Sequence, residues 1–162
     1  MNPLCEGTSI DHFKVLRHLA QGGMGEVYLA RDTLLGRRVA LKMIRQKERS
    51  EAALGRFLDE SRLTASLNHP NIVAVYTAGS YQGNPYLALE YVEGQNLRQR
   101  MREDRPGAWE SIRILLSVAN ALVEAHRQGI LHRDLKPENV VIGKDGRVRV
   151  LDFGIAKLQS SS

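Results

Sequence analysis

The first part of the chain has the apolar pattern of β-strands. Turns that contain glycine separate three such stretches between Phe13 and Ile44, which predicts a three-stranded antiparallel meander. The apolar positions of the stretches are Val15, Leu16 and Leu19, then Val27, Tyr28 and Leu29, then Val39, Leu41 and Ile44.

A helical period follows over residues 51–67, before His69, Pro70 and Asn71 interrupt it. Its apolar residues are Leu54, Phe57, Leu58, Leu63 and Leu67. Residues 72–75 and 86–91 then read as two strands joined by a turn at Gly83 and Asn84. The first lobe is therefore predicted to contain five strands and one helix.

The second half of the chain begins with a polar connector at residues 93–96, and a helix is expected from Leu97 to Met101. A longer helix, which Gly129 caps, carries one apolar face. This face comprises Ile112, Leu115, Leu116, Ala119, Leu122, Val123 and His126. Residues 140–142 and 147–151 flank a glycine-rich turn and predict a hairpin.

The composition indicates a globular protein but does not distinguish between possible functions. The 162 residues are 43% hydrophobic and 25% charged, which is typical of a globular chain. The net charge of +5 suits either nucleic acid or nucleotide phosphates. The densest basic stretch, residues 98–105, has no interleaved aromatic residues, so a solvated basic face is favoured over a nucleic-acid site.

The single cysteine, Cys5, excludes an internal disulfide and favours a reducing compartment, so we expect a cytoplasmic location and an idle thiol near a loose terminus. No signal peptide or membrane segment is visible in the sequence.

Two motifs of the first lobe are ambiguous when each is taken alone. Gly22, Gly23 and Gly25 lie at a turn where backbone amides can approach phosphate oxygens, but a Gly-x-x-Gly is expected about once by chance at this composition. Lys42 ends a strand, and Glu60 on the following helix can supply an opposing carboxylate; a surface lysine and an unrelated glutamate are the alternative.

The run from His132 to Asn139 is far more specific. Five fixed residues at ~1/20 each give odds below roughly one in a thousand for a random match. Those five are His132, Arg133, Asp134, Lys136 and Asn139. A carboxylate to receive a hydroxyl proton, a cation beside a transferring phosphoryl group and an amide oxygen for a metal are what phosphoryl transfer needs. Asp152, Phe153 and Gly154 follow the hairpin and add a second metal-ligand candidate.

With these motifs the chain resembles the eukaryotic-like, Hanks-type serine/threonine protein kinases over about residues 13–157. The glycine turn and the run from His69 to Val73 are similar to those of bacterial members. The resemblance implies an α+β fold with two lobes, the small lobe complete and the large lobe incomplete. Its boundaries would be an N-terminal lead at 1–10, a small lobe at 11–92, a hinge connector at 93–96 and a partial large lobe at 97–162.

The resemblance also implies a site for ATP and Mg²⁺. Asp134 would be the catalytic base, Lys136 would steady the transferring phosphate, and Lys42 would bind nucleotide phosphates while paired with Glu60. Asn139 and Asp152 would hold the metal. The nucleotide itself would be bound by Leu19, Ala20, Gly22, Gly23, Gly25, Val27, Ala40, Lys42, Leu89, Glu90, Val92 and Val141.

Two departures qualify this reading. Ala20 stands where the family's glycine loop begins with glycine, and the sequence ends at Ser162 before the family's Ala-Pro-Glu anchor and later helices. We therefore expect a protein with Ser/Thr hydroxyls as the substrate of the parent, weak or no activity of this chain alone, and association through the uncovered face between Ile112 and Val123. An ATP-binding interaction module without turnover is the alternative function, and nucleic-acid binding is a third.

Overall fold

The computed structural model describes residues 3–23, 25–45 and 50–153. These residues form two compact units, and each is described by itself. The first unit contains the described residues of Met1–Ser61 together with Val75–Tyr91. The second contains Arg62–Ala74 and the described residues from position 92 onward, so the division falls within helix α1 (Glu51–Ala65).

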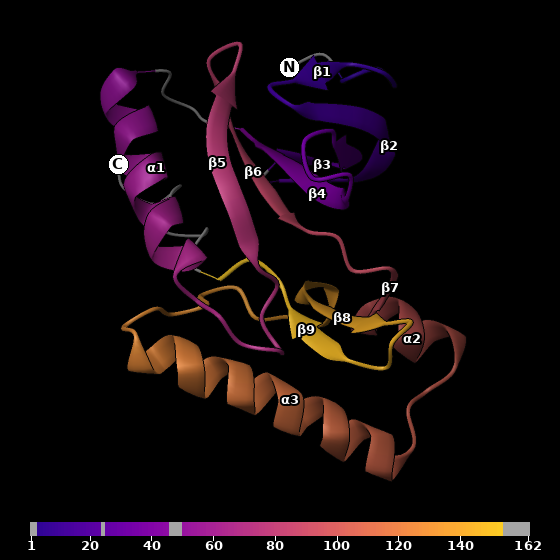
Figure 1. Ribbon diagram of the computed structural model, residues 1–162. Coiled ribbons are helices and arrows are strands. Elements are labelled where there is room, and N and C mark those ends of the chain that lie inside the picture. Colours follow the sequence, from indigo (N-terminus) through magenta and orange to yellow (C-terminus); the bar gives the residue numbers. More distant parts are fainter. Residues whose placement is uncertain (1–2, 24, 46–49, 154–162) are drawn as a thin grey trace. The chain divides into compact units, whose positions relative to one another are not determined.

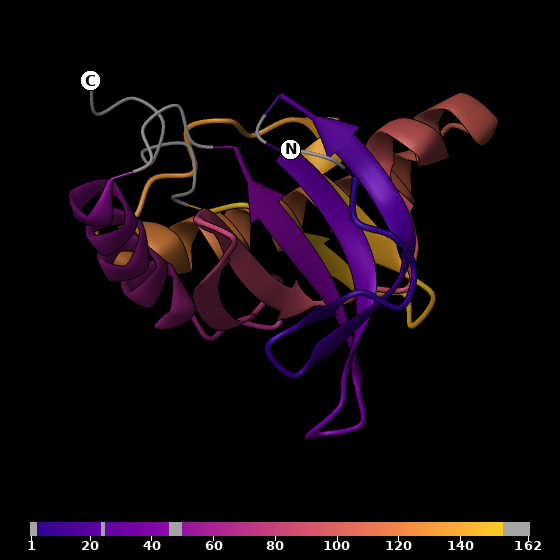
Figure 2. The ribbon, with the colours of Figure 1, turned by 90° about the horizontal axis from the view of Figure 1, so that it is seen from above.

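The first unit is built on a six-stranded antiparallel sheet with the strand order β1-β2-β3-β4-β6-β5. Figure 2 shows the twist of its strands. The strands are β1 (Ser9–Ile10), β2 (Phe13–Gly22), β3 (Gly25–Asp32), β4 (Arg38–Ile44), β5 (Val75–Tyr81) and β6 (Asn84–Glu90). The predicted meander is confirmed as β2, β3 and β4.

Alternation along the strands gives the sheet two different faces. One face carries a cluster of buried apolar side chains from β1, β2, β3, β4 and β6. The cluster comprises Ile10, Phe13, Val15, Tyr28, Ala30, Val39, Leu41, Met43, Tyr86 and Ala88. The alternate positions of the same strands therefore point to the opposite face, which is the one that matters for the candidate site.

Two details of the first unit differ from the prediction. The strand expected at residues 72–75 is wrong: β5 begins at Val75, and Ile72 instead forms an isolated bridge with Val150 in the second unit. The loose terminus expected around Cys5 is also wrong, although the thiol itself is exposed. The backbone N–H of Leu4 donates to the hydroxyl of Tyr28 over 3.0 Å, and the short strand β1 extends the sheet.

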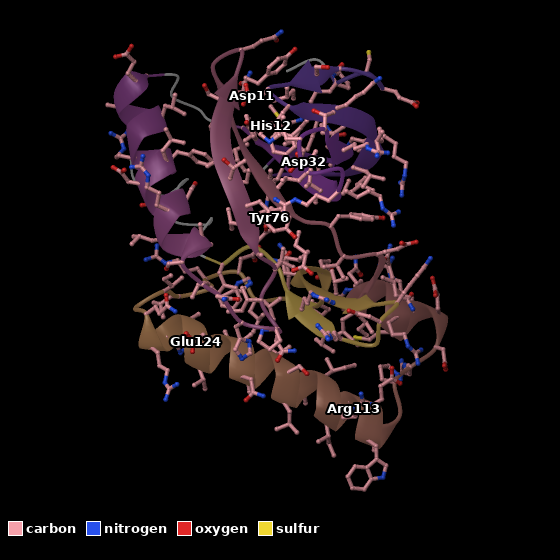
Figure 3. The ribbon with its side chains drawn as sticks, in the orientation of Figure 1. Asp11, His12, Asp32, Tyr76, Arg113 and Glu124 are labelled. Carbon is pink, nitrogen blue, oxygen red and sulfur yellow. The ribbon has the colours of Figure 1, made fainter. Side chains whose placement is uncertain are left out.

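The turn between β3 and β4 is held by Asp32, which is only 1% exposed. Its carboxylate accepts the backbone N–H groups of Leu34 and Leu35 and lies 3.3 Å from Nε of Arg37. The hydrogen bond from Leu35 is the largest reason why the pKa of Asp32 is lowered. His12 approaches the same carboxylate from the segment before β2 (Figure 3), at 3.8 Å. Asp32 therefore joins the turn to the start of the sheet.

The second unit combines a three-stranded antiparallel sheet, in the order β7-β8-β9, with helices (Figure 1). Its elements are β7 (Gly94–Asn96), α2 (Leu97–Glu103), α3 (Ala108–Arg127), a short 3₁₀ helix η1 (Pro137–Asn139), β8 (Val140–Gly143) and β9 (Val148–Val150). The predicted hairpin is confirmed as β8 and β9. Within the predicted connector at residues 93–96, Gly94–Asn96 form β7, which pairs with β8.

The predicted helix is confirmed as α3, and it packs through a different face from the apolar stripe described above. Ile114, Val118, Ala121 and Ala125 are buried in the core of this unit. The stripe expected from the sequence is exposed instead, with values of 47% for Ile112, 66% for Leu115, 58% for Leu116 and 56% for Val123. The expected exposure of an apolar face is thus confirmed for the described residues. No helix in the described part of the chain is long and apolar enough to cross a membrane.

Candidate functional site

The glycine turn between β2 and β3 combines open space with one crowded backbone position. Gly22 and Gly23 have no other atom within 4 Å of where a Cβ would stand. Gly25 has a φ of +139°, and a Cβ there would lie 1.9 Å from the backbone oxygen of Met43. Only glycine fits that position, and the preceding turn stays free of side chains at the two other glycines. Such a turn suits the approach of a phosphate group.

Lys42 lies on the sheet face opposite the apolar cluster and is 5% exposed. The strand register places it between Val27 of β3 and Leu87 of β6. The next row on the same face pairs Ala40 with Leu89. The structure therefore brings Val27, Ala40, Lys42 and Leu89 onto one face, as strand alternation requires.

Glu60 lies on α1 in the same unit and is half-buried. Both Glu60 and Lys42 take part in polar or electrostatic interactions. Their pairing with each other stays a prediction. Burial of a lysine at this depth calls for compensating polar partners, because an isolated ammonium group is costly to remove from water.

The loop before η1 joins the predicted base to the predicted phosphate-binding lysine. The Nζ of Lys136 lies 2.6 Å from Oδ2 of Asp134. This hydrogen bond is the largest cause that lowers the pKa of Asp134, and it also raises the pKa of Lys136. Asp134 is therefore ionised near neutral pH, which leaves its carboxylate able to accept a proton.

Asn139 holds the same loop from the other side. Its Nδ2 donates to the backbone oxygen of Asp134 over 2.8 Å, and its own backbone oxygen accepts the N–H of Leu151. Because the amide nitrogen is used in this way, the amide oxygen Oδ1 is the atom that remains for a metal ligand. Asn139 is 8% exposed, so its orientation is fixed by packing as well as by hydrogen bonds.

His132 was predicted only as part of the motif, without a role of its own. It is 3% exposed, and its Nε2 lies 2.7 Å from the backbone oxygen of Leu151. Its Nδ1 accepts the backbone N–H of Asp134 over 3.3 Å. The ring therefore links the segment of the predicted base to the segment of Asp152, and it stacks edge-on against Phe153 with a centroid distance of 4.8 Å.

Two residues in this region that are not glycine adopt a positive φ. Arg133 has a φ of 65° and Asp152 a φ of 63°. This left-handed conformation is uncommon for such residues and is found disproportionately at functional sites. Gly154, the last residue of the predicted Asp-Phe-Gly motif, lies outside the described residues.

The donor set fits a magnesium ion. Mg²⁺ prefers oxygen ligands and is usually held by one or two carboxylates together with substrate phosphates. Asp152 supplies one carboxylate and Asn139 one amide oxygen, and within the described ranges no group of three His, Cys, Asp or Glu residues is placed to hold a metal without a substrate. A metal that depends on phosphate oxygens is the kind that this set would hold.

The predicted residues divide between the two units. The first unit contains Leu19, Ala20, Gly22, Gly23, Gly25, Val27, Ala40, Lys42, Glu60, Leu89 and Glu90. The second contains Val92, Asp134, Lys136, Asn139, Val141 and Asp152. The structure brings residues together within each set, and the convergence of the two sets around one nucleotide stays a prediction.

Comparison with known proteins gives one family for nearly the whole chain. The family model described as "Protein kinase domain" matches residues 13–162. A probable serine/threonine-protein kinase PknB of Lactococcus lactis is 40% identical over 155 residues, covering 94% of this chain and 25% of that protein. Serine/threonine-protein kinase PrkC of Bacillus subtilis is 38% identical over 152 residues, covering 93% of this chain and 24% of that protein.

Solved structures agree with the sequence comparison. The crystal structure of the Mycobacterium tuberculosis PknI kinase domain superposes with a TM-score of 0.84 at 34% identity. The match covers 98% of this chain and 64% of that one. Of the two curated relatives, the kinases of Lactococcus lactis and Bacillus subtilis, the chain spans about a quarter of the length.

Proposed function

Because the chain belongs to the protein kinase domain family, in its bacterial Hanks-type serine/threonine branch, we propose that it binds ATP with Mg²⁺ and carries residues that transfer the terminal phosphoryl group to a protein serine or threonine. The observation that carries this proposal is the network of Asp134, Lys136 and Asn139. In it the carboxylate of Asp134 accepts hydrogen bonds from the Lys136 ammonium group and from the Asn139 amide nitrogen. These are the groups that phosphoryl transfer needs side by side.

Asp134 would accept the proton of the substrate hydroxyl as its oxygen attacks the terminal phosphorus. The bond between that phosphorus and the bridging oxygen breaks, and ADP leaves. Since Lys136 lowers the pKa of Asp134, the carboxylate is a weak base that stays ionised at neutral pH. Its main contribution would be to orient the hydroxyl, which suits a reaction governed by positioning and charge stabilisation.

Lys136 and the metal would balance negative charge. The Lys136 ammonium lies beside Asp134 and would contact the transferred phosphoryl group as it passes to the substrate. Asn139 and Asp152 would hold Mg²⁺, which when bound neutralises charge on the phosphates. His132 would act as a positioning residue, because it connects the segments of Asp134 and Asp152 without reaching the reacting atoms itself.

The first unit would bind the nucleotide. The glycine turn would place its backbone amides on the phosphates, and Lys42, paired with Glu60, would bind phosphate oxygens. Leu19, Val27, Ala40 and Leu89, with Val141 of the second unit, would enclose the adenine ring. Backbone groups of Glu90 and Val92 would form hydrogen bonds with the adenine ring. Ala20 would stand at the start of the glycine loop beside the phosphates.

Phosphotransfer from labelled ATP and Mg²⁺ to a protein substrate tests this function. We expect the full-length parent to be active and Asp134→Asn to reduce its rate by about 100-fold or more. Since the chain spans 64% of the PknI kinase domain chain, we expect the 162 residues alone to react slowly. A parent whose rate is unaffected by Asp134→Asn would contradict the proposal, and ATP binding without any transfer would favour the interaction module.

A further inference from the structure

The second unit contains a pocket that shares no residue with the predicted nucleotide and catalytic sites. It has a volume of about 690 Å³, within the usual range for ligand sites. Its lining comes from the loop before Ile72, from α3 and from the β8–β9 hairpin. The lining residues are Pro70, Asn71, Glu110, Arg113, Ile114, Ser117, Ile142, Gly146, Arg147 and Val148.

The pocket and the predicted adenine site use opposite faces of β8. Val141 is the residue predicted to contact adenine, whereas its neighbour Ile142 lines the pocket. Successive side chains of a strand point to opposite faces, so one strand can serve both sites without sharing a side chain. Ile142 is half-buried, while Ile114 and Val148 are 4% and 7% exposed and form an apolar floor.

The walls of the pocket are held by hydrogen bonds. The side chain Nδ2 of Asn71 donates to the backbone oxygen of Val148 over 2.7 Å. The backbone oxygen of Asn71 accepts the N–H of Val150, and the N–H of Val73 donates to the oxygen of Val150. The hairpin turn is closed by the N–H of Gly146 on the oxygen of Gly143 at 2.9 Å. A preformed pocket of this kind loses little entropy when a ligand binds.

The charges around the pocket leave a net positive rim. Glu110 is occupied by Arg100, whose Nη2 lies 3.1 Å from its carboxylate. Asp145 is held at 2.8 Å by Arg149, which leaves only a 4.0 Å approach to Nε of Arg147. Arg113 on α3 (Figure 3) forms no ion pair within the described part of the chain. Arg113 and Arg147 are therefore the two cations that a ligand can engage.

From this apolar floor and this basic rim we propose that the pocket is a docking site for an extended acidic peptide segment of a partner protein, with one aliphatic side chain on the floor and flanking carboxylates on Arg113 and Arg147. Arginine suits this role because its planar fork can bind a carboxylate through two parallel hydrogen bonds. The binding does not depend on phosphoryl transfer, because the pocket contains no residue assigned to that reaction.

Fluorescence anisotropy of the 162-residue chain with a fluorescein-labelled peptide, Glu-Leu-Glu-Leu-Asp, tests the site. We expect saturable binding, and we expect the double variant Arg113→Glu, Arg147→Glu to weaken it by about tenfold or more. The matched control is Arg127→Glu together with Arg102→Glu, which makes the same charge change at exposed arginines outside the pocket. The control pair should bind as tightly as the unchanged chain.

Four results of these binding measurements would overturn the proposal. The first is no saturable binding, and the second is an equal loss in the control pair, which would show attraction to overall charge. The third is equally tight binding of a peptide with serine in place of both leucines, because the apolar floor would then contribute nothing. The fourth is binding of free glutamate as tight as that of the peptide, which would make the pocket a small-anion site.

Three further measurements complete the test, and the first of them uses the unchanged chain alone. In methyl NMR spectra of the unchanged chain, the peptide should shift the signals of Ile114, Ile142 and Val148, and unshifted signals would contradict the site. Sedimentation should give the same mass for the unchanged chain and for the Arg113, Arg147 variant. A lower mass for the variant would make the pocket a contact between copies and overturn the peptide assignment. The variant Lys42→Ala should bind the peptide normally, which separates this site from the nucleotide site.

Discussion

The variant Gly25→Ala should destabilise the β2–β3–β4 region far more than its size suggests. A Cβ at this position would lie 1.9 Å from the backbone oxygen of Met43 and 3.0 Å from its carbonyl carbon. A carbon and a carbonyl oxygen in contact need about 3.3 Å, so the two strands would have to separate by roughly 1.4 Å there. Because the obstacle is backbone rather than a flexible side chain, rotation of a side chain cannot relieve it.

The expected cost follows from two contributions. A φ of +139° is strained for any residue with a Cβ, at about 1–3 kcal/mol. Separation of the strands at the pair of Gly25 with Ile44 also loses one or two backbone hydrogen bonds at about 1 kcal/mol each. The sum is about 2–5 kcal/mol.

Amide hydrogen exchange of β3 and β4 is the appropriate assay, because it reports the local free energy of opening in a chain with two units. The matched control is Gly23→Ala, since a Cβ at Gly23 meets no atom within 4 Å. We expect exchange in the control to change by less than about 0.5 kcal/mol. Equal protection of β3 in both variants would refute the reasoning.

Three other predictions address the remaining features. Lys136→Met should raise the pKa of the Asp134 carboxylate toward its ordinary value of 3.8, as measured by NMR titration, and an unchanged pKa would contradict the pairing. Because the pKa of Asp134 is lowered in the folded chain, the stability that this pair contributes is present at neutral pH and is lost only as the pH falls through that pKa. Leu115→Gln with Leu116→Gln should change stability by less than about 0.5 kcal/mol per site but reduce self-association in sedimentation, and unaltered association would show that this face is not the contact. Phe57→Ala should cost about 3–5 kcal/mol in exchange of the α1 amides, because the ring is fully buried, and a loss below 1 kcal/mol would be inconsistent with that burial.

Apolar runs separated by turns that contain glycine made most of the first sheet predictable. Short runs of apolar residues bounded by turns specify the strands β2, β3 and β4. Strand β5 was misplaced because Thr77, Gly79 and Ser80 give it no such pattern, and its residues are mostly half-buried. Strand β7 has only three residues and exists because β8 pairs with it, which no local pattern reports.

Helix α3 shows a second limit of sequence patterns. Its period was clear, but two faces of the helix are apolar. The face with the larger residues, such as Leu115 and Leu116, is exposed, and the face with Ala121 and Ala125 is buried. Small residues allow close packing against β9, a preference that hydrophobicity alone does not reveal.

The candidate site was predicted mainly by its motif. Asp134, Lys136 and Asn139 are close in sequence, and the motif that contains them marked all three as candidates. Their hydrogen bonds to one another are a finding of the structure. The contact from His132 to Leu151 spans 19 positions and depends on how the loop folds back on the end of β9. Neither the partner of this contact nor the positive φ at Asp152 could be predicted from a local pattern, because both arise from tertiary structure.

Calorimetric titration of the chain with ATP, with and without Mg²⁺, tests the central claim most directly. The claim predicts binding that requires Mg²⁺ and that weakens by about tenfold or more in both Lys42→Ala and Asp152→Ala. The control Lys14→Ala, an exposed lysine of β2, should bind as the unchanged chain does. Equal affinity in all four proteins would show that Lys42 and Asp152 do not serve one nucleotide site.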